Sequence, residues 1–172
     1  METHPAAARV KILALDVDGV LTDGRLYYGN NGEELKAFNI KDGLGIKLLR
    51  DAGVQVAIIT GRSSDIVRRR AQELGIEDII QGREDKRDAL AELCAQRAIA
   101  IEDAAYMGDD LPDLGAITAA GLGLTVADGC EEVRAAADWC SRYNGGCGAV
   151  REACQYILEA RGELTATLAD FR

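Results

Sequence analysis

The chain has 172 residues, of which 48% are hydrophobic and 5% aromatic, and its formal net charge is −9. That length and apolar content suit one well-buried core, so we expect a single domain over residues 1–172. The acidic balance argues against a nucleic-acid surface, and no apolar run approaches the roughly 20 residues of a membrane span. We therefore expect a cytoplasmic protein without nucleic-acid or membrane partners.

Several common kinds of catalytic site are missing from the sequence. The single histidine, His4, falls in residues 1–9, which we expect to form a flexible arm, and this argues against Ser-His and Cys-His catalysis. The five cysteines include no Cys-x-x-Cys pair, which argues against a zinc site, and no phosphate-binding glycine loop ending in Lys-Ser/Thr is present. Carboxylates remain as the main candidates for chemistry.

The first half of the chain begins with an apolar run over residues 10–15 that predicts a buried strand. Residues 25–39 follow, with Asn31 and Gly32 between two β-prone segments, and this pattern predicts a β-hairpin. Asp42 then resembles the N-cap of a helix that ends at Gly53, and residues 54–59 form the next apolar strand.

Strands and helices continue to alternate in the second half of the chain. This alternation predicts an α/β fold with a doubly wound, mainly parallel sheet of the Rossmann-like kind and helices on both faces. The expected helices span residues 63–74, 86–97 and 149–160; the expected strands lie near Ile79 and over residues 104–107, 122–126 and 139–140; and residues 161–172 form a C-terminal tail.

Two carboxylates, Asp16 and Asp18, follow the first strand, where Gly19 and Gly24 permit turns. Ligands of open α/β sheets bind at this carboxyl edge. Because two close carboxylates repel each other, both stay ionised only beside a cation or strong hydrogen bonds, and magnesium prefers such oxygen ligands. A turn that only caps a helix is the alternative for an isolated Asp-x-Asp.

Polar groups also follow the other predicted strands. Thr60, Gly61 and Arg62 come after the second strand and supply a hydroxyl and exposed amides at a helix start, where anions are favoured. Lys86 opens a later helix, and Gly108 precedes the pair Asp109 and Asp110. Each feature alone fits a helix cap, a turn or a solvated charge, so only their combination points to a site.

The order Asp-x-Asp, Thr, Lys and Gly-Asp-Asp resembles the four motifs of the haloacid dehalogenase-like (HAD-like) phosphatases. The resemblance covers nearly the whole chain and is closest to the subfamily that acts on 3-deoxy-D-manno-octulosonate 8-phosphate (KDO 8-phosphate). It rests on residues 16–24, 29–39, 59–62, 108–111 and 145–152. Many members carry a cap domain after the first motif or between the third and fourth, but neither gap here has room for one.

The resemblance implies a role for each motif residue. Asp16 would be the nucleophile that forms an aspartyl-phosphate, and Asp18 the general acid and then the general base. Magnesium would be held by the Asp16 carboxylate, the Asp18 backbone carbonyl and the Asp109 carboxylate. Phosphate would be bound by Thr60, Gly61 and Lys86, and Asp110 would orient Lys86 or a water on the metal.

A sugar acid phosphate needs a cation for its carboxylate as well. Arg62 and Arg70 are the candidates for that cation. By the resemblance, the residues near substrate would also include Asp18, Asn39, Ile40, Lys41, Asp42, Gly43, Lys47 and Lys86. The subfamily implies a homotetramer in which the hairpins assemble and a neighbouring subunit closes each site.

Three alternatives stay open. Arg62 favours the octulosonate, since phosphatases of nonulosonate 9-phosphates tend to carry Glu at that position, but a nine-carbon substrate is the nearest alternative. A phospho-accepting receiver domain also combines acids, Thr, Lys and magnesium, although it places its acidic residues in a different order. A catalytically silent scaffold is the third.

Overall fold

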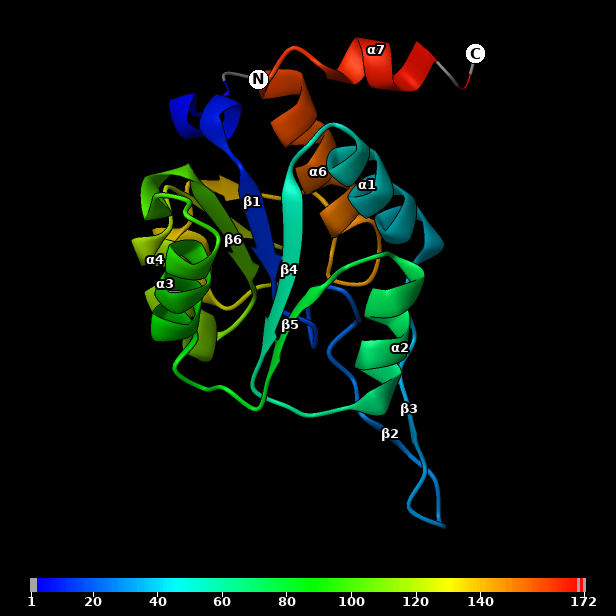
Figure 1. Cartoon of the computed structure of the whole chain (residues 1–172). Helices are drawn as coiled ribbons and strands as arrows, with labels where there is room; N and C mark the ends of the chain where they lie inside the picture. Colours follow the sequence, from blue (N-terminus) through cyan, green and yellow to red (C-terminus); the bar gives the residue numbers. More distant parts are fainter. Residues whose placement is uncertain (1–2, 170, 172) are drawn as a thin grey trace.

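Six parallel strands form the central sheet of the computed structural model, which describes residues 3–169 and 171 (Figure 1). They are β1 (Ile12–Leu15), β4 (Gln55–Thr60), β5 (Asp78–Gln81), β6 (Ala104–Gly108), β7 (Leu122–Thr125) and β8 (Trp139–Cys140). Their order is β5-β4-β1-β6-β7-β8. The chain builds outward on one side of β1 and then crosses to the other, which creates a switch point beside β1. The predicted α/β fold is confirmed.

Helices cover both faces of the sheet (Figure 1). One face carries α1 (Ile40–Asp51), α2 (Asp65–Glu73) and α6 (Ala149–Ala160), and the other carries α3 (Lys86–Gln96), α4 (Leu114–Ala119) and α5 (Glu131–Ala136). Successive side chains of a strand point to opposite faces, so Leu13 and Leu15 enter the first core while Ile12 and Ala14 enter the second. This two-sided burial explains why β1 is apolar throughout.

The predicted hairpin consists of β2 (Tyr27–Tyr28) and β3 (Glu34–Leu35), which pair antiparallel. It extends away from the body of the molecule beyond the carboxyl ends of the strands (Figure 1). Gly32 has a φ of +84°, as the turn requires. Between Gly24 and Thr60 the chain forms only this hairpin, α1 and β4, so these fully described residues contain no cap domain.

The N-terminal segment differs from the flexible arm that the sequence suggested. Pro5–Arg9 is a 3-10 helix in which Ala6 and Ala7 are buried, and the His4 backbone N–H donates to the hydroxyl of Tyr156 on α6 at 2.7 Å. The sequence did not indicate this packing, because the small alanines of this segment show no apolar periodicity. Met1 and Glu2, also in the expected arm, lie outside the described residues.

The start of α1 also differs from expectation. Asn39 is the N-cap, because its Oδ1 accepts from the backbone N–H of Lys41 at 2.8 Å. Asp42 lies inside the helix, is buried, and accepts from the backbone N–H of Arg151 at 2.8 Å. Asp42 therefore joins the first turn of α1 to the first turn of α6.

The C-terminal tail contains a short helix, α7 (Leu164–Ala169); the tail residues Asp170 and Arg172 lie outside the described residues. Within the described part of the chain, no helix has both the length and the apolar character needed to cross a membrane.

Candidate active site

The groups predicted at the strand ends meet at one edge of the sheet. Asp16 follows β1, Thr60 ends β4, Asp109 follows β6, and Lys86 begins α3. They line a cavity of about 270 Å³ together with Asp18, Gly24, Gly61, Arg62, Glu84, Asp110, Pro112 and Asp113. The parallel sheet thus brings together residues that lie more than ninety positions apart in the sequence.

Asp113 is the buried centre of a hydrogen-bond network. Its Oδ1 accepts from Lys86 Nζ at 2.7 Å and from the Tyr106 hydroxyl at 2.6 Å. Its Oδ2 accepts from the backbone N–H groups of Asp109 and Asp110 at 3.0 and 3.2 Å. Four donors satisfy both carboxylate oxygens, so Asp113 is a fixed support for its neighbours.

Lys86 links this support to Asp16, whose Oδ1 lies 3.0 Å from Lys86 Nζ. Burial alone would lower the pKa of Lys86, but the carboxylates of Asp16 and Asp113 raise it above its ordinary value. Lys86 therefore stays charged and is held between two acids. Its position allows it to contact an oxygen of a phosphoryl group bound at Asp16.

The carboxylates of the site repel one another. Burial and the charge of Asp113 raise the pKa of Asp16 to about 8, although Lys86 partly offsets them. Burial and the charges of Asp113 and Asp110 raise the pKa of Asp109 to about 7. A cation bound between these groups would remove that penalty.

The donor set fits a hard divalent cation. Carboxylate oxygens of Asp16, Asp109 and Asp113 lie within 4.8 Å of one another. Because Asp113 already accepts four hydrogen bonds, Asp16 and Asp109 are the carboxylates best able to bind the ion directly. Gly19, with a φ of +95°, leaves room for Asp109, since a Cβ there would overlap the Asp109 carboxylate. These all-oxygen donors fit magnesium.

Asp18 lines the same cavity and contacts the hairpin. Lys36 Nζ, just beyond β3, donates to Asp18 Oδ1 at 2.6 Å and lies 3.2 Å from Glu34 Oε1. Arg62 lies 3.8 Å from Asp18 Oδ2 and 3.6 Å from Glu34 Oε1. Two cations and two carboxylates thus connect the hairpin to the site.

A second cavity, of about 330 Å³, lies at the other end of β4 and β5. Its arginines already have partners: Arg97 pairs with Asp78, and Arg50 donates to the backbone carbonyl of Leu74 at 2.9 Å. No group of the Asp16 network reaches it. The sizes of the two cavities do not show which one is the candidate active site, but the side chains that line them do.

Comparisons with known proteins agree with this geometry. A family model for haloacid dehalogenase-like hydrolases matches residues 76–153. The 3-deoxy-D-manno-octulosonate 8-phosphate phosphatase KdsC of Escherichia coli K12 is 48% identical over 158 residues, which cover 92% of this chain and 84% of that protein. The chain belongs to the KDO 8-phosphate phosphatase family.

Solved structures of this family superpose closely on the chain. The KDO 8-phosphate phosphatase of Moraxella catarrhalis, in complex with magnesium, phosphate and KDO, is 49% identical with a TM-score of 0.96 and covers 97% of this chain and 96% of that one. The cobalt-bound enzyme of Haemophilus influenzae is 44% identical with a TM-score of 0.90 and covers 94% of each chain. The shared fold thus includes structures solved with divalent metal ions.

The structure does not bring every predicted residue to the cavity. Those with a predicted role in catalysis, metal binding or phosphate binding line it, as do Arg62 and Asp110. The residues on or beside α1, and Arg70 on α2, do not: Asn39, Ile40, Lys41, Asp42, Gly43, Lys47 and Arg70. Arg70 instead lies over the Phe38 ring, with its guanidinium carbon 5.7 Å from the ring centroid.

Two expectations about individual residues need correction. The acids that contact Lys86 are Asp113 and Asp16, whereas the Asp110 carboxylate accepts from the backbone N–H of Leu111 at 2.8 Å. Of the two roles expected for Asp110, contact with a water on the metal therefore stays a prediction. Asp42, expected near substrate, has its carboxylate buried against the start of α6.

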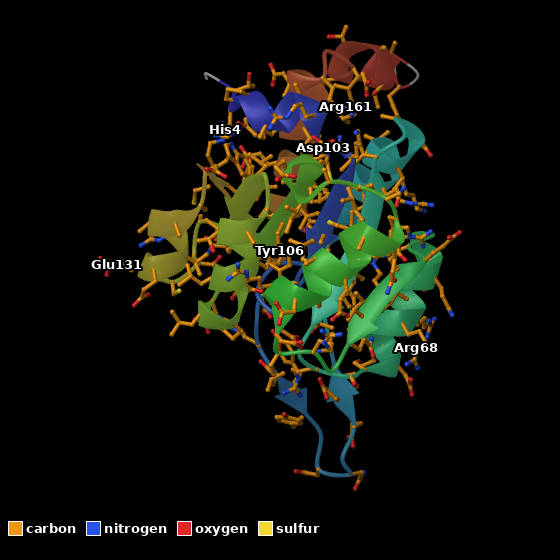
Figure 2. All side chains as sticks on the ribbon, turned by 60° about the vertical axis from the view of Figure 1, so that its left-hand side comes forward. His4, Arg68, Asp103, Tyr106, Glu131 and Arg161 are labelled. Atoms are coloured by element: carbon orange, nitrogen blue, oxygen red, sulfur yellow. The ribbon has the colours of Figure 1, made fainter. Side chains whose placement is uncertain are left out.

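Sequence reasoning missed Asp113 and Lys36, which contact the predicted site residues Lys86 and Asp18, and Tyr106, which donates to Asp113. Asp113 follows Asp110 by one turn, and that spacing was the available signal. The single histidine has no part here, because His4 lies at the end of the sheet away from the hairpin, near Arg161 and Asp103 (Figure 2).

Proposed function

We propose that this chain is a magnesium-dependent phosphatase that hydrolyses KDO 8-phosphate to KDO and inorganic phosphate, in the cytoplasmic synthesis of lipopolysaccharide precursors. One observation carries this proposal: Asp16, Asp18, Thr60, Lys86 and Asp109 line a single cavity in a chain of this family. These are the groups that phosphate monoester hydrolysis needs, a nucleophile, an acid and base, and charge for the phosphoryl oxygens.

In the first half of the reaction, a carboxylate oxygen of Asp16 bonds to phosphorus, and the bond from phosphorus to the sugar oxygen breaks. Asp18 gives its proton to that leaving oxygen. Thr60, the Gly61 amide and Lys86 bind the phosphoryl oxygens. Asp113 keeps Lys86 aimed at them, because the two groups are 2.7 Å apart and buried.

In the second half, a water oxygen bonds to phosphorus, Asp18 takes a proton from that water, and the bond from phosphorus to Asp16 breaks. Inorganic phosphate leaves and Asp16 is restored. Magnesium, held by the Asp16 and Asp109 carboxylates and the Asp18 backbone carbonyl, would supply positive charge next to the phosphoryl group.

Arg62 supports the assignment of a sugar acid as substrate. Its side chain is 45% exposed and lines the cavity beside Asp18. A guanidinium at this place can bind a substrate carboxylate with paired hydrogen bonds. Both an octulosonate and a nonulosonate carry a carboxylate, so the preference for the octulosonate rests on the resemblance, in which phosphatases of nonulosonate 9-phosphates tend to carry Glu in place of Arg62.

A homotetramer would complete the site. The hairpin and the start of α1 expose apolar side chains, namely Leu26, Tyr27, Tyr28, Leu35, Ile40 and Leu44. Exposed apolar side chains gathered in one region of a protein are typical of an interface. The same region holds Asn39, Lys41 and Lys47, which do not line the cavity of their own chain, and these residues would then contact substrate in a neighbouring subunit.

Steady-state phosphate release tests the function. We expect the purified protein to hydrolyse KDO 8-phosphate faster than a nonulosonate 9-phosphate and than common hexose phosphates, and to lose activity when EDTA removes magnesium. Asp16→Asn should lower kcat by at least about a thousandfold. Faster turnover of the nonulosonate 9-phosphate would overturn the substrate assignment, and no metal-dependent turnover of any sugar phosphate would overturn the function.

A further inference from the structure

The side chain of Lys36 reaches the active site from the hairpin. In a strand, alternate residues point to the same side. Glu34 and Lys36 accordingly face Asp18 and Arg62, while Leu35 between them is exposed. Glu34 and Lys36 thus lie on the side of the hairpin that contacts the predicted general acid and base, and Leu35 lies on the other side.

Lys36 is a fixed group. Its side chain is only 1% exposed, compared with 45% for Arg62. A buried ammonium is costly unless it is paired, and the carboxylates near Lys36 are Asp18, which accepts its hydrogen bond at 2.6 Å, and Glu34, an ion-pair neighbour at 3.2 Å. Withdrawing Lys36 from Asp18 would leave a poorly solvated cation without its hydrogen bond, so its burial holds Lys36 on Asp18.

The orientation of Asp18 depends on this contact. Across the described residues, the Lys36 hydrogen bond is the one that the structure gives the Asp18 carboxylate. Arg62 is 3.8 Å from the other oxygen, too far for a hydrogen bond. Charge-assisted hydrogen bonds are the strong ones, and a bond of 2.6 Å is within that class.

We propose that Lys36 is a positioning residue for Asp18 and holds its carboxyl group in the orientation that both proton transfers need. The proposal rests on the proposed function in one respect, the assignment of Asp18 as acid and base. In the first step the carboxyl must face the leaving oxygen, and in the second it must face the attacking water. Loss of the hydrogen bond would let the side chain rotate away and slow both transfers.

Aryl phosphates with different leaving groups test this role without the sugar. A p-nitrophenolate leaves readily without a proton, whereas phenolate depends more on the acid. Lys36→Met keeps the length of the side chain but removes its charge and donors. We expect kcat/KM for phenyl phosphate to fall about 10- to 100-fold, a part of what a general acid contributes, and kcat/KM for p-nitrophenyl phosphate to fall by less than about threefold.

A double-mutant cycle makes the test specific. If Lys36 acts through Asp18, adding Lys36→Met to Asp18→Asn should change kcat/KM for phenyl phosphate by less than about threefold. Lys36→Arg, which keeps a charged donor, should restore part of the loss. Equal losses for both aryl phosphates, or the same loss in the Asp18→Asn background, would overturn the proposal.

Two control variants guard against a general effect on folding. Lys11→Met makes the same substitution at the other end of the sheet, where Lys11 pairs with Asp103, and should leave the ratio of the two activities unchanged. Glu34→Gln leaves Lys36 on Asp18 and should also preserve that ratio. A ratio altered by Glu34→Gln as strongly as by Lys36→Met would contradict the role of Lys36. Failure to hydrolyse KDO 8-phosphate would instead defeat only the substrate assignment.

Discussion

The carboxyl edge of the sheet and the hairpin both supply groups to the proposed active site, but they are built differently. At the edge, Asp113 is buried and accepts four hydrogen bonds, and Lys86 is buried between Asp113 and Asp16. In the hairpin, each strand has two residues, and Tyr28 and Leu35 are 67% and 64% exposed. A two-stranded hairpin is marginally stable alone in water. The half of the proposed site around Lys86 and Asp113 is therefore rigid by itself, whereas the half around Asp18 depends on hairpin contacts.

Asp113→Asn should have the largest effect on the rigid half. The amide cannot accept from Lys86 and Tyr106 and also from two backbone N–H groups, and it leaves the Lys86 charge with one partner. We expect kcat to fall on the order of a hundredfold and the free energy of unfolding to fall by about 3 kcal/mol, measured by urea denaturation. Asp88→Asn, the same change at an exposed position of α3, should alter neither. A stable, fully active Asp113→Asn variant would refute the rigidity of this edge.

Leu35→Glu tests the dependence of the other half on assembly. A charge on the exposed side of the hairpin should weaken a tetramer by about 2 kcal/mol per contact and lower the sedimentation coefficient at fixed concentration. Activity on KDO 8-phosphate should fall with the loss of tetramer. Ala95→Glu adds the same charge on the exposed surface of α3 and should leave both unchanged. An unchanged sedimentation coefficient in Leu35→Glu would argue against the hairpin as the interface.

Tyr106→Phe makes a smaller change inside the rigid half. It removes one donor to Asp113 but leaves Lys86 and both backbone N–H groups in place. Stability should fall by about 1 kcal/mol and kcat by only a few-fold. Tyr143→Phe, at an exposed tyrosine, is the matched control. If Tyr106→Phe lowered stability and kcat as much as Asp113→Asn, the three remaining donors would not be enough to hold Asp113 in place.

Glu152→Gln should have the smallest effect and a defined pH dependence. Burial opposes the charged form of Glu152, but hydrogen bonds from Ser141 and Arg142 outweigh it and lower its pKa below the ordinary 4.5. Since the folded pKa is depressed, the stabilisation is present above pH 4.5 and is lost as the pH falls through the folded value. The variant should be about 1 kcal/mol less stable than wild type at pH 7 and equally stable in strong acid. A difference that grows toward low pH would contradict this sign.

Much of the carboxyl edge of the sheet could be predicted from the sequence. Strands such as β1 are continuous apolar runs that the sequence reveals directly. Because Asp16 and Asp18 come directly after β1 in the sequence, their place at the end of that strand could be predicted. Asp113 was missed because its contact with Lys86 depends on the 3-10 turn Leu111–Asp113, which carries the acid back beneath the strand end. Helices α4 and α5 were missed because their six residues each are too few for a clear period.

The hairpin was predictable as an element but not in its contacts. Asn31 and Gly32 indicate a turn, yet nothing local indicates that Lys36 folds back onto Asp18. The N-cap of α1 was misassigned for a related reason. Both Asn39 and Asp42 are good capping residues, and only the packing of α1 against α6 decides that Asp42 caps across to Arg151.

The covalent step at Asp16 is the central claim, and trapping the intermediate tests it most directly. Asp18→Asn should slow the attack of water more than the transfer of phosphate from p-nitrophenyl phosphate. Acid quenching followed by mass spectrometry should then find one phosphoryl group on the peptide that contains Asp16. Turnover within a few-fold of wild type, with no phosphoryl group on that peptide, would contradict both the nucleophile and the acid and base assignments.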